Sequence, residues 1–485
     1  MAKQKHERKQ QSGEQAHRRI TRREMLKLSG AFTAGSLLVA QRPGLILEPT
    51  EALTDAPGNA PSASVTNVVV MHQRNELSED QENQFETSNP DITIEFLGLD
   101  LPLFFSMYAA GNPPDLLRVS GASIPNYLYR GVLYDLTSYF EASTVLEPDD
   151  LAPVNNYYRA NSPFEIGAGA FYGICKDWSP DFTVFIYTQP FIDAGIDVPD
   201  AGTPLTYQQV RQHAWDLLHA GGVAHSTGKQ ALTFGYGYFD SWIDRIWMNM
   251  LAELGEHLYS EGFTRIVLTG NEAARAVVQY YYDLAADNLV SNPLNPSPSW
   301  VGGDFTNGIL AMIQTGYWFS AMAESATTAG KVKMLPAPTW AGVPRDPCMT
   351  GTGMIMAAIS GVPNEAWRII EWYNGLEPAI ERASSGWGVP PLKSLYHLMP
   401  NTTAFQQQVQ SVLMGELALN TPVLQFNPFL EENVVANAWW KYLEQALKHQ
   451  ITFDEMLASI EEEVNDAILS QLSNHVYLPL VLNQH

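Results

Sequence analysis

Apolar positions in the first hundred residues follow the order strand, helix, strand. Residues 68–71 (Val-Val-Val-Met) form an unbroken apolar run, which predicts a strand buried on both faces. Residues 78–88 are mostly polar with Phe85 directed inward, which predicts a helix, and apolar residues alternate over 92–96 as in a second strand. Two strands joined by a crossover helix pair in parallel, so a βαβ unit is expected here.

Later helices are marked by their first turns. Thr206 with Gln209, and Thr452 with Glu455, fit the capping box, in which two side chains satisfy the free amides of a helix start. Pro363 precedes an apolar pattern of helical period and fits the first turn of a helix. Helices and strands alternate through most of the chain, which predicts an α/β fold.

The first 40 residues differ in charge from the rest. They hold nine Lys and Arg against three acids, in a chain whose net charge is -24. Thr21-Arg22-Arg23-Glu24-Met25-Leu26-Lys27 resembles the twin-arginine export motif. The apolar run after it is about 13 residues, shorter than the about 20 of a membrane span. We therefore predict an export signal over 1–40, with a disordered basic tail as the alternative, and a Pro-rich flexible spacer over 41–64.

Composition limits the classes of partner. With 45% hydrophobic and 16% charged residues, the chain is globular, and it is long enough for two domains. Its acidity argues against nucleic acid, whose phosphates require Lys and Arg. Membrane contact is expected only through the leader, if this stays uncleaved. Twelve Trp and 21 Tyr exceed what we expect from packing alone.

A series of short segments carries a family resemblance. In chain order they are AAGNPPDL (109–116), GVLYDL (131–136), FYGI (171–174), VFIYT (184–188), AGI (194–196), PLTY (204–207), FTNGILAM (305–312), GYW (316–318) and PAP (336–338). This ordered set resembles the extracellular solute-binding proteins of ABC importers, in the family-one group that mostly binds sugars, over roughly residues 65 to 470.

The resemblance implies a two-lobed periplasmic-binding-protein fold of type II. Its hinge is crossed by the chain more than once, here near 175–179 and 348–351. Lobe one is expected at 65–175 plus 350–400, and lobe two at 176–349 plus 401–485. The expected function is capture of a sugar or oligosaccharide between the lobes and delivery to the permease of an ABC transporter, by a monomer without catalytic activity, cofactor or metal.

A sugar offers flat apolar faces and a rim of hydroxyls, so its site needs aromatic planes and polar side chains. For the aromatic candidates the alternative is packing in the core, and for His72 it is a capping role. The candidate ligand-binding residues are Trp178, Trp242, Trp318, Trp387, Tyr238, His72, Gln73, Ser120 and Thr352.

The two cysteines fall, by the same resemblance, at the two hinge crossings. Cys175 and Cys348 are the only cysteines of the chain. If the crossing segments run antiparallel, the two residues could face each other, and an exported protein meets oxidising surroundings. A disulfide is therefore expected, with two buried free thiols as the alternative.

Other functions remain open at this point. An exported polysaccharide hydrolase would need two carboxylates facing its substrate. Asp149-Asp150 and Glu461-Glu462-Glu463 are better explained as solvated surface, and no nucleophile elbow or zinc motif is present. A binding protein for a polyamine, peptide or organic anion is the nearer alternative.

Overall fold

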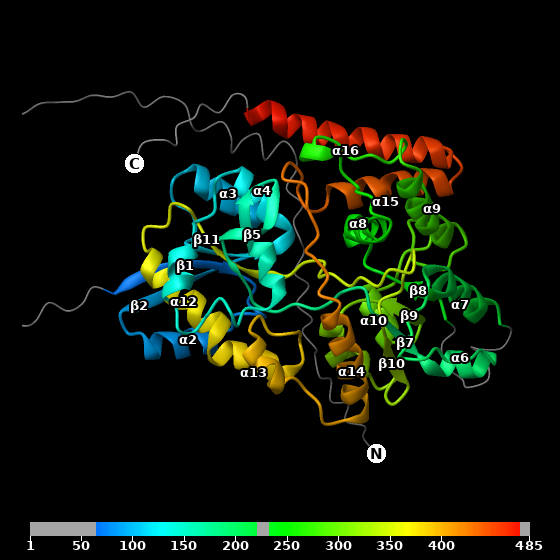
Figure 1. Ribbon diagram of the computed structural model, residues 1–485, viewed down its shortest axis with the longest axis horizontal. Coiled ribbons are helices and arrows are strands. Elements are labelled where there is room, and N and C mark those ends of the chain that lie inside the picture. Colours follow the sequence, from blue (N-terminus) through cyan, green and yellow to red (C-terminus); the bar gives the residue numbers. More distant parts are fainter. Residues whose placement is uncertain (1–64, 221–231, 476–485) are drawn as a thin grey trace, which may run out of the picture. The chain divides into compact units, whose positions relative to one another are not determined.

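The computed structural model describes residues 65–220 and 232–475 of the chain. The predicted export leader and spacer, 1–40 and 41–64, lie outside these described residues. Within the described ranges, no helix combines the length and apolar character needed to cross a membrane. Two main sheets, each accompanied by helices, form the α/β fold that the sequence predicts (Figure 1).

The first sheet has five strands and contains the predicted βαβ unit. Its order is β2 (Ile92–Gly98), β1 (Thr66–His72), β3 (Leu116–Ser120), β11 (Thr352–Met356) and β6 (Ile174–Cys175). β1 pairs in parallel with β2 and β3, whereas β11 runs antiparallel to β3 and β6. The crossover helix α2 (Glu79–Ser88) starts with a capping box between Ser78 and Gln81. The prediction for this opening segment is confirmed.

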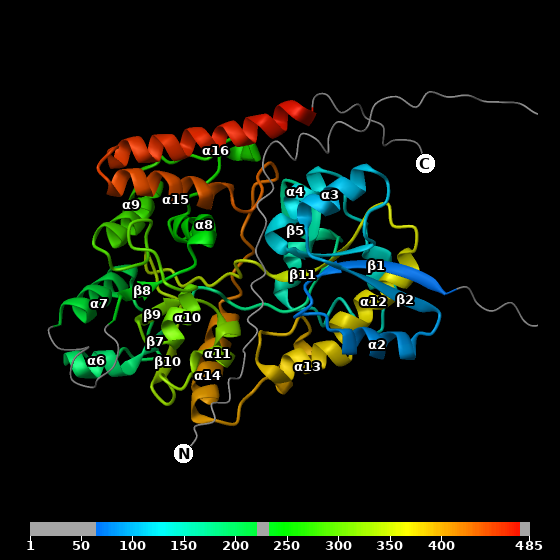
Figure 2. The ribbon, with the colours of Figure 1, turned by 180° about the vertical axis from the view of Figure 1, so that it is seen from behind.

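Helices cover both faces of the first sheet. Besides α2, they are α3 (Leu101–Ala109), α4 (Ile124–Tyr129), α5 (Thr137–Ala142), α12 (Pro363–Gly375) and α13 (Glu377–Ser385). Figures 1 and 2 show α2 and α12 on one face and α3 and α4 on the other. Val68 and Val70 of β1 pack toward α2 and α12, whereas Met71 packs toward α3 and α4. An apolar residue is therefore needed at each of these three positions of the strand.

The second sheet has four strands, in the order β10 (Val332–Leu335), β7 (Val184–Tyr187), β9 (Leu310–Gln314) and β8 (Phe234–Gly237). β8 and β9 are parallel, and β7 is antiparallel to β9 and β10. A separate two-stranded ribbon is formed by β4 (Arg159–Ser162) and β5 (Glu165–Phe171). Since parallel strands end at the same edge of a sheet, the segments that follow β8 and β9 emerge side by side.

The remaining helices accompany the second sheet. They are α6 (Thr188–Ala194), α7 (Tyr207–His219), α8 (Ile243–Glu253), α9 (Glu272–Ala286), α10 (Val301–Thr306), α11 (Ser320–Ala323), α14 (Ala404–Ala418), α15 (Val434–Leu447) and α16 (Phe453–His475). α7 packs on β8 and β9, α10 on β9 and α14 on β10, while α15 packs on α8, α9 and α16. The predicted capping boxes at Thr206 and Thr452 are present.

The chain passes between the two sheets through segments that lie side by side. It leaves the first sheet after Cys175 and enters β7 at Val184, then returns between β10 and β11. The backbone N–H of Lys176 donates to the carbonyl of Thr352 at 2.8 Å, and that of Asp181 donates to Pro347 at 3.2 Å. We call residues 176–182 and 346–351 the connecting segments; they run antiparallel.

Two buried aspartates bind these connecting segments to each other. Asp181 Oδ2 accepts the N–H of Met349 at 2.6 Å, and Asp346 Oδ1 accepts the N–H of Phe182 at 2.7 Å. Each carboxylate thus satisfies a backbone amide of the opposite segment, and both side chains are buried. A buried amide without a partner is costly, so these two bonds fix the segments to each other.

The predicted disulfide is not present, because the register of the connecting segments separates the two cysteines. The residue opposite Cys175 is Gly353, and Cys348 lies five positions earlier in the chain. Both thiols are free and buried. Cys175 Sγ donates to the carbonyl of Asp177 at 2.9 Å, and Cys348 Sγ accepts the N–H of Gly351 at 3.0 Å. The alternative of two buried thiols describes the structure.

Unreduced protein should therefore carry two titratable thiols. Burial raises the pKa of both Cys175 and Cys348 well above the ordinary value, so neither reacts readily in the folded state. We expect a chromogenic thiol reagent to detect two thiols after denaturation without reductant and close to none before it. Detection of no thiol after denaturation would show a disulfide.

Asp181 should make stability depend on pH. Burial raises its pKa from 3.8 to about 6, against hydrogen bonds from Met349 and Ser179, so the folded carboxyl holds its proton more tightly than the unfolded one. As pH rises from about 4 to about 7, this group should lower the free energy of unfolding by up to about 3 kcal/mol.

The variant Asp181→Asn keeps an oxygen for the Met349 amide and removes this titration. Measured by urea unfolding across the same pH range, the free energy of unfolding of this variant should fall less with rising pH than that of the wild type. Asp466→Asn, at an exposed position, should leave the fall unchanged. Equal slopes in the wild type and Asp181→Asn would contradict this assignment.

Candidate functional site

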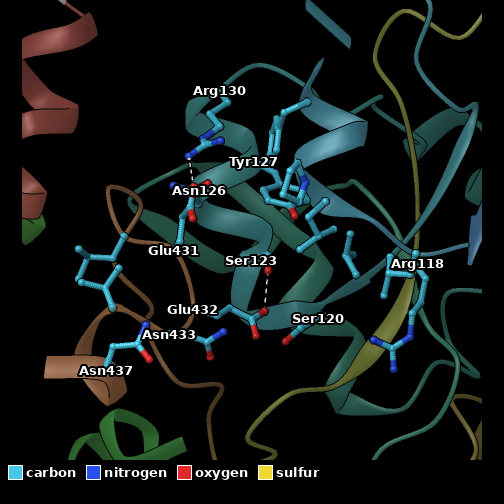
Figure 3. A pocket seen from close by; sticks show the side chains of 17 residues that line it. Arg118, Ser120, Ser123, Asn126, Tyr127, Arg130, Glu431, Glu432, Asn433 and Asn437 are labelled. Carbon is cyan, nitrogen blue, oxygen red and sulfur yellow. Dashed lines mark hydrogen bonds and ion pairs between the residues drawn. The ribbon is translucent and has the colours of Figure 1, made fainter. Parts of the chain in front are cut away.

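A cavity of about 600 Å³ lies where the first sheet's helices meet the segment before α15 (Figure 3). Ten of its seventeen lining residues are polar or charged. The lining residues are Leu99, Leu101, Pro102, Phe105, Arg118, Val119, Ser120, Ser123, Asn126, Tyr127, Arg130, Leu430, Glu431, Glu432, Asn433, Val434 and Asn437. We call it the main cavity.

One wall of the main cavity is built by the turn after β3. The Ser120 hydroxyl caps this turn by accepting the N–H of Ala122 at 3.2 Å. The chain then enters α4, and Ser123, Asn126, Tyr127 and Arg130 follow at spacings that place them on one helical face. Sequence reasoning selected Ser120 alone and missed the other four. Their spacing at positions i, i+3, i+4 and i+7 is the signal that could have found them.

The opposite wall comes from residues 430–437, more than 300 positions later in the chain. Ser123 Oγ donates to Glu432 Oε1 at 2.6 Å, and Arg130 pairs with Glu431 at 3.0 Å (Figure 3). The Asn126 amide donates to the carbonyl of Pro428 at 3.0 Å. These contacts hold the two walls together, and no local sequence pattern predicts such a pairing.

Glu432 is the charged centre of the main cavity. Its second oxygen binds Arg245 of α8 at 3.0 Å, and the Arg245 side chain is 1% exposed. Although burial raises the pKa of Glu432, the charge of Arg245 and the Ser123 hydroxyl more than offset this, and its pKa lies below the ordinary value. Glu432 therefore presents an ionised acceptor to a ligand that donates hydroxyl hydrogens.

Arg118, which also lines the main cavity, belongs to a cluster of oppositely charged side chains. Glu76 accepts two hydrogen bonds from Arg118, at 2.8 and 2.9 Å, and Lys176 lies 3.6 Å from Glu76 and also contacts Asp177. Burial raises the pKa of Glu76, but Arg118 and Lys176 lower it to about 2. These charges pair with one another, so they fix the position of Arg118.

Three of the predicted tryptophans lie in one series with Phe239. Ring centroids are 4.7 Å apart for Trp242 and Phe239, 5.8 Å for Phe239 and Trp318, and 6.4 Å for Trp318 and Trp387. We call these four residues the aromatic row. Trp387 is 40% exposed, and the other three rings are partly exposed. Partly exposed aromatic planes are what stacking on a sugar requires.

The edge of the second sheet explains how the aromatic row forms. Phe239 and Trp242 follow β8, and Trp318 follows the neighbouring parallel strand β9. Gly316 precedes Trp318 and passes so close to the connecting segment that a Cβ there would collide with the side chains of Ser179 and Asp181. Arg245 links the aromatic row to the main cavity, because it lies 5.9 Å from the Trp242 ring and pairs with Glu432.

Trp178 and Tyr238 have structural contacts. The indole N–H of Trp178 donates to the carbonyl of Pro390 at 3.2 Å, and its backbone bridges to Val389, so it anchors the loop that carries Trp387. Tyr238 is 8% exposed and packs against Tyr281 at 4.8 Å, close to the aromatic row without belonging to it.

His72, Gln73 and Thr352 lie around the end of the first sheet but do not line the main cavity. His72 is fully buried against Tyr373, and burial lowers its pKa to about 3, so it is neutral. Its Nδ1 lies 3.3 Å from the carbonyl of Gln73. Thr352 pairs with Ser120 across β3 and β11, so it lies directly behind the cavity wall.

A metal site is not evident in the described ranges, which contain no group of three or more His, Cys, Asp or Glu able to hold an ion. The carboxylates of the main cavity, Glu431 and Glu432, are each held by an arginine. The hydroxyl, amide and carboxylate groups of the lining can hydrogen-bond to a polar ligand.

Comparison with known families identifies the chain. A family model described as bacterial extracellular solute-binding protein matches residues 83–408, more than half of the chain. This protein belongs to the bacterial extracellular solute-binding proteins. The resemblance found in the sequence is thereby confirmed. A search of curated proteins found no match.

Solved structures show the same two-domain fold. The ABC substrate-binding protein Lmo0181 from Listeria monocytogenes, in complex with cycloalternan, has a TM-score of 0.67 at 18% identity, over 84% of this chain and 99% of its own. The sugar-binding protein MalE from Xanthomonas citri has a TM-score of 0.63 at 16% identity, over 85% and 100%. A solute-binding protein from Thermotoga lettingae bound with alpha-D-tagatose gives 0.63 at 16%, over 84% and 100%. These relatives are substrate-binding proteins and not enzymes.

Proposed function

We propose that this solute-binding protein captures a sugar or oligosaccharide and delivers it to the permease of an ABC transporter. The observation that carries the proposal is the combination of the main cavity with the aromatic row. The cavity offers serine, asparagine, arginine and glutamate side chains for sugar hydroxyls, and the aromatic row offers planes for the apolar faces of the rings. The solved relatives that bind sugars support this choice.

The proposed ligand lies between two lobes that close on it. We assign lobe one to residues 65–175 plus 350–400 and lobe two to 176–349 plus 401–485. The connecting segments act as the hinge in this proposal, because they join the two sheets and pair with each other. Closure is favoured when one ligand contacts residues of both lobes, such as Ser123 and Trp318.

The direct test is a thermal-shift screen of the purified protein against mono- and oligosaccharides. A ligand that binds only the folded state raises the melting temperature, by an amount that depends on its concentration and dissociation constant. We expect at least one sugar to do so, and chromatography should return that sugar intact. No shift with any sugar, or the recovery of cleaved products, would contradict the proposal.

Two substitutions in the aromatic row should weaken binding of that sugar and spare the fold. Trp318→Ala and Trp387→Ala remove stacking surface at partly exposed positions, and we expect each to raise the dissociation constant about tenfold in calorimetry. The matched control is Trp215→Ala, a tryptophan of similar exposure on α7, at 41%, outside the aromatic row. Unchanged affinity in both row variants would remove the aromatic row from the site.

Export by the twin-arginine route is the proposed way to the outside of the cytoplasm. Replacing Arg22 and Arg23 with Lys should block export, because the route reads this pair. Replacing the nearby pair Arg18 and Arg19 with Lys keeps the same charge and should leave export intact. Immunoblots of cytoplasmic and exported fractions measure both. Equal export of the two variants would contradict the route.

A further inference from the structure

A second cavity, of about 380 Å³, lies at the edge of the second sheet and shares no lining residue with the main cavity. It is bounded by β8 and the residues after it, by residues 290–301 before and at the start of α10, and by one residue of α15. We call it the lobe-two cavity. Asn437 lines the main cavity and Trp440 the lobe-two cavity, one turn apart on α15, so this helix borders both.

The lobe-two cavity contains a buried carboxylate that is only half satisfied. Asp304 is 1% exposed; its Oδ2 accepts the Ser297 hydroxyl, whereas Oδ1 has no hydrogen-bond partner among the described residues. A buried polar atom without a partner is costly, so Asp304 Oδ1 indicates a ligand that donates a hydrogen bond.

The charges of this lining favour a cation. It includes the carboxylates of Asp304 and, at its exposed rim, Asp240, and it includes no Lys, Arg or His. The partly exposed rings of Trp300 and Phe239, with centroids 6.3 Å apart, add aromatic faces that attract a cation. An anionic ligand would be repelled by both carboxylates.

Hydrogen-bond capacity separates an amine from a neutral sugar. An ammonium group has three donors and no acceptor, whereas a sugar hydroxyl both donates and accepts. The side chains around this cavity supply no amide and no basic group, only hydroxyls and indole N–H groups as donors. The main cavity is the opposite case, because it offers two arginines and three asparagines.

We propose that the lobe-two cavity binds a protonated primary amine, with Asp304 as its counter-ion and Trp300 as its aromatic face. This cavity shares Phe239 with the aromatic row of the proposed sugar site, but its charged centre, Asp304, belongs to neither the row nor the main cavity. The amine could be carried by an amino sugar that extends past α15 or by a small free amine. Both share the same ammonium chemistry, and the volume suits either.

Calorimetry on the full protein tests the proposal with ligands that differ in one group. D-glucosamine has an amine where D-glucose has a hydroxyl, and N-acetyl-D-glucosamine has the same nitrogen without its charge. We expect D-glucosamine to bind at least tenfold more tightly than the other two. Ethanolamine identifies the source: comparable binding of ethanolamine indicates a free amine, and its failure to bind indicates an amino sugar.

Variants place the amine in this cavity. Asp304→Asn keeps the shape and removes the charge, and we expect it to weaken D-glucosamine binding at least tenfold, as should Trp300→Ala, whose ring is 48% exposed. Exposed Asp193→Asn on α6 of the same lobe should have no effect. A melting temperature close to the wild type's confirms that a variant is folded, and Trp300→Ala provides the test if Asp304→Asn is not.

Three results would overturn the proposal: no binding of D-glucosamine to the wild type, equal binding of D-glucose, or unchanged binding in both cavity variants. Failure here is distinct from failure of the sugar site. A neutral oligosaccharide found in the thermal-shift screen should still bind Asp304→Asn with wild-type affinity, because Asp304 does not line the main cavity.

Discussion

The pairing of the two connecting segments is the constraint on which the rest of the structure depends. Asp181 and Asp346 each accept a backbone N–H from the opposite segment, and these bonds are made by buried carboxylates. These bonds therefore hold the segment that enters the second sheet and the segment that returns to the first in one register with each other. Tyr157 adds to this by donating to the carbonyl of Cys348 at 2.5 Å and accepting the N–H of Leu424 at 3.0 Å. No room remains for a side chain at two positions, and glycine stands at both: at 316, which passes the first connecting segment, and at 353, where β11 passes β6.

This register also decides where the functional side chains lie. β11 begins directly after the connecting segment 346–351. It pairs Thr352 with Ser120, and this pairing positions the turn after β3 that forms one wall of the main cavity. On the other side, Gly316 packs against Ser179 and Asp181, so Trp318 takes its place next to Phe239 and Trp387. The polar cavity and the aromatic row are thus positioned by the same few backbone contacts. The affinity for a ligand that contacts both would therefore depend on the geometry of the connecting segments.

The acidic side chains around the two cavities differ in whether they have a basic partner. Around the main cavity the acids are paired with arginines, as in Glu432 with Arg245 and Glu76 with Arg118, so the cavity offers both donors and acceptors. In the lobe-two cavity Asp304 has no basic partner among the lining residues. The two cavities, which both border α15, therefore offer different hydrogen-bond partners: the main cavity has arginine and asparagine donors, and the lobe-two cavity has neither.

The sequence by itself determined the α/β class, the βαβ opening, the helix starts at Thr206, Pro363 and Thr452, and the family. These features rest on apolar periodicity, on caps within a few residues of the helix they start, and on short segments in a fixed order. It also singled out Trp242, Trp318 and Trp387, because the family resemblance places their segments at the cleft and because Trp387 stands between two glycines in a loop. Only the tertiary structure decided which partners they have. Glu432 meets Ser123, and Asp304 lines a cavity with Trp440, across more than 100 positions of chain. The register of the connecting segments separated Cys175 from Cys348, since pairing between distant strands depends on packing of both sheets and not on any local pattern.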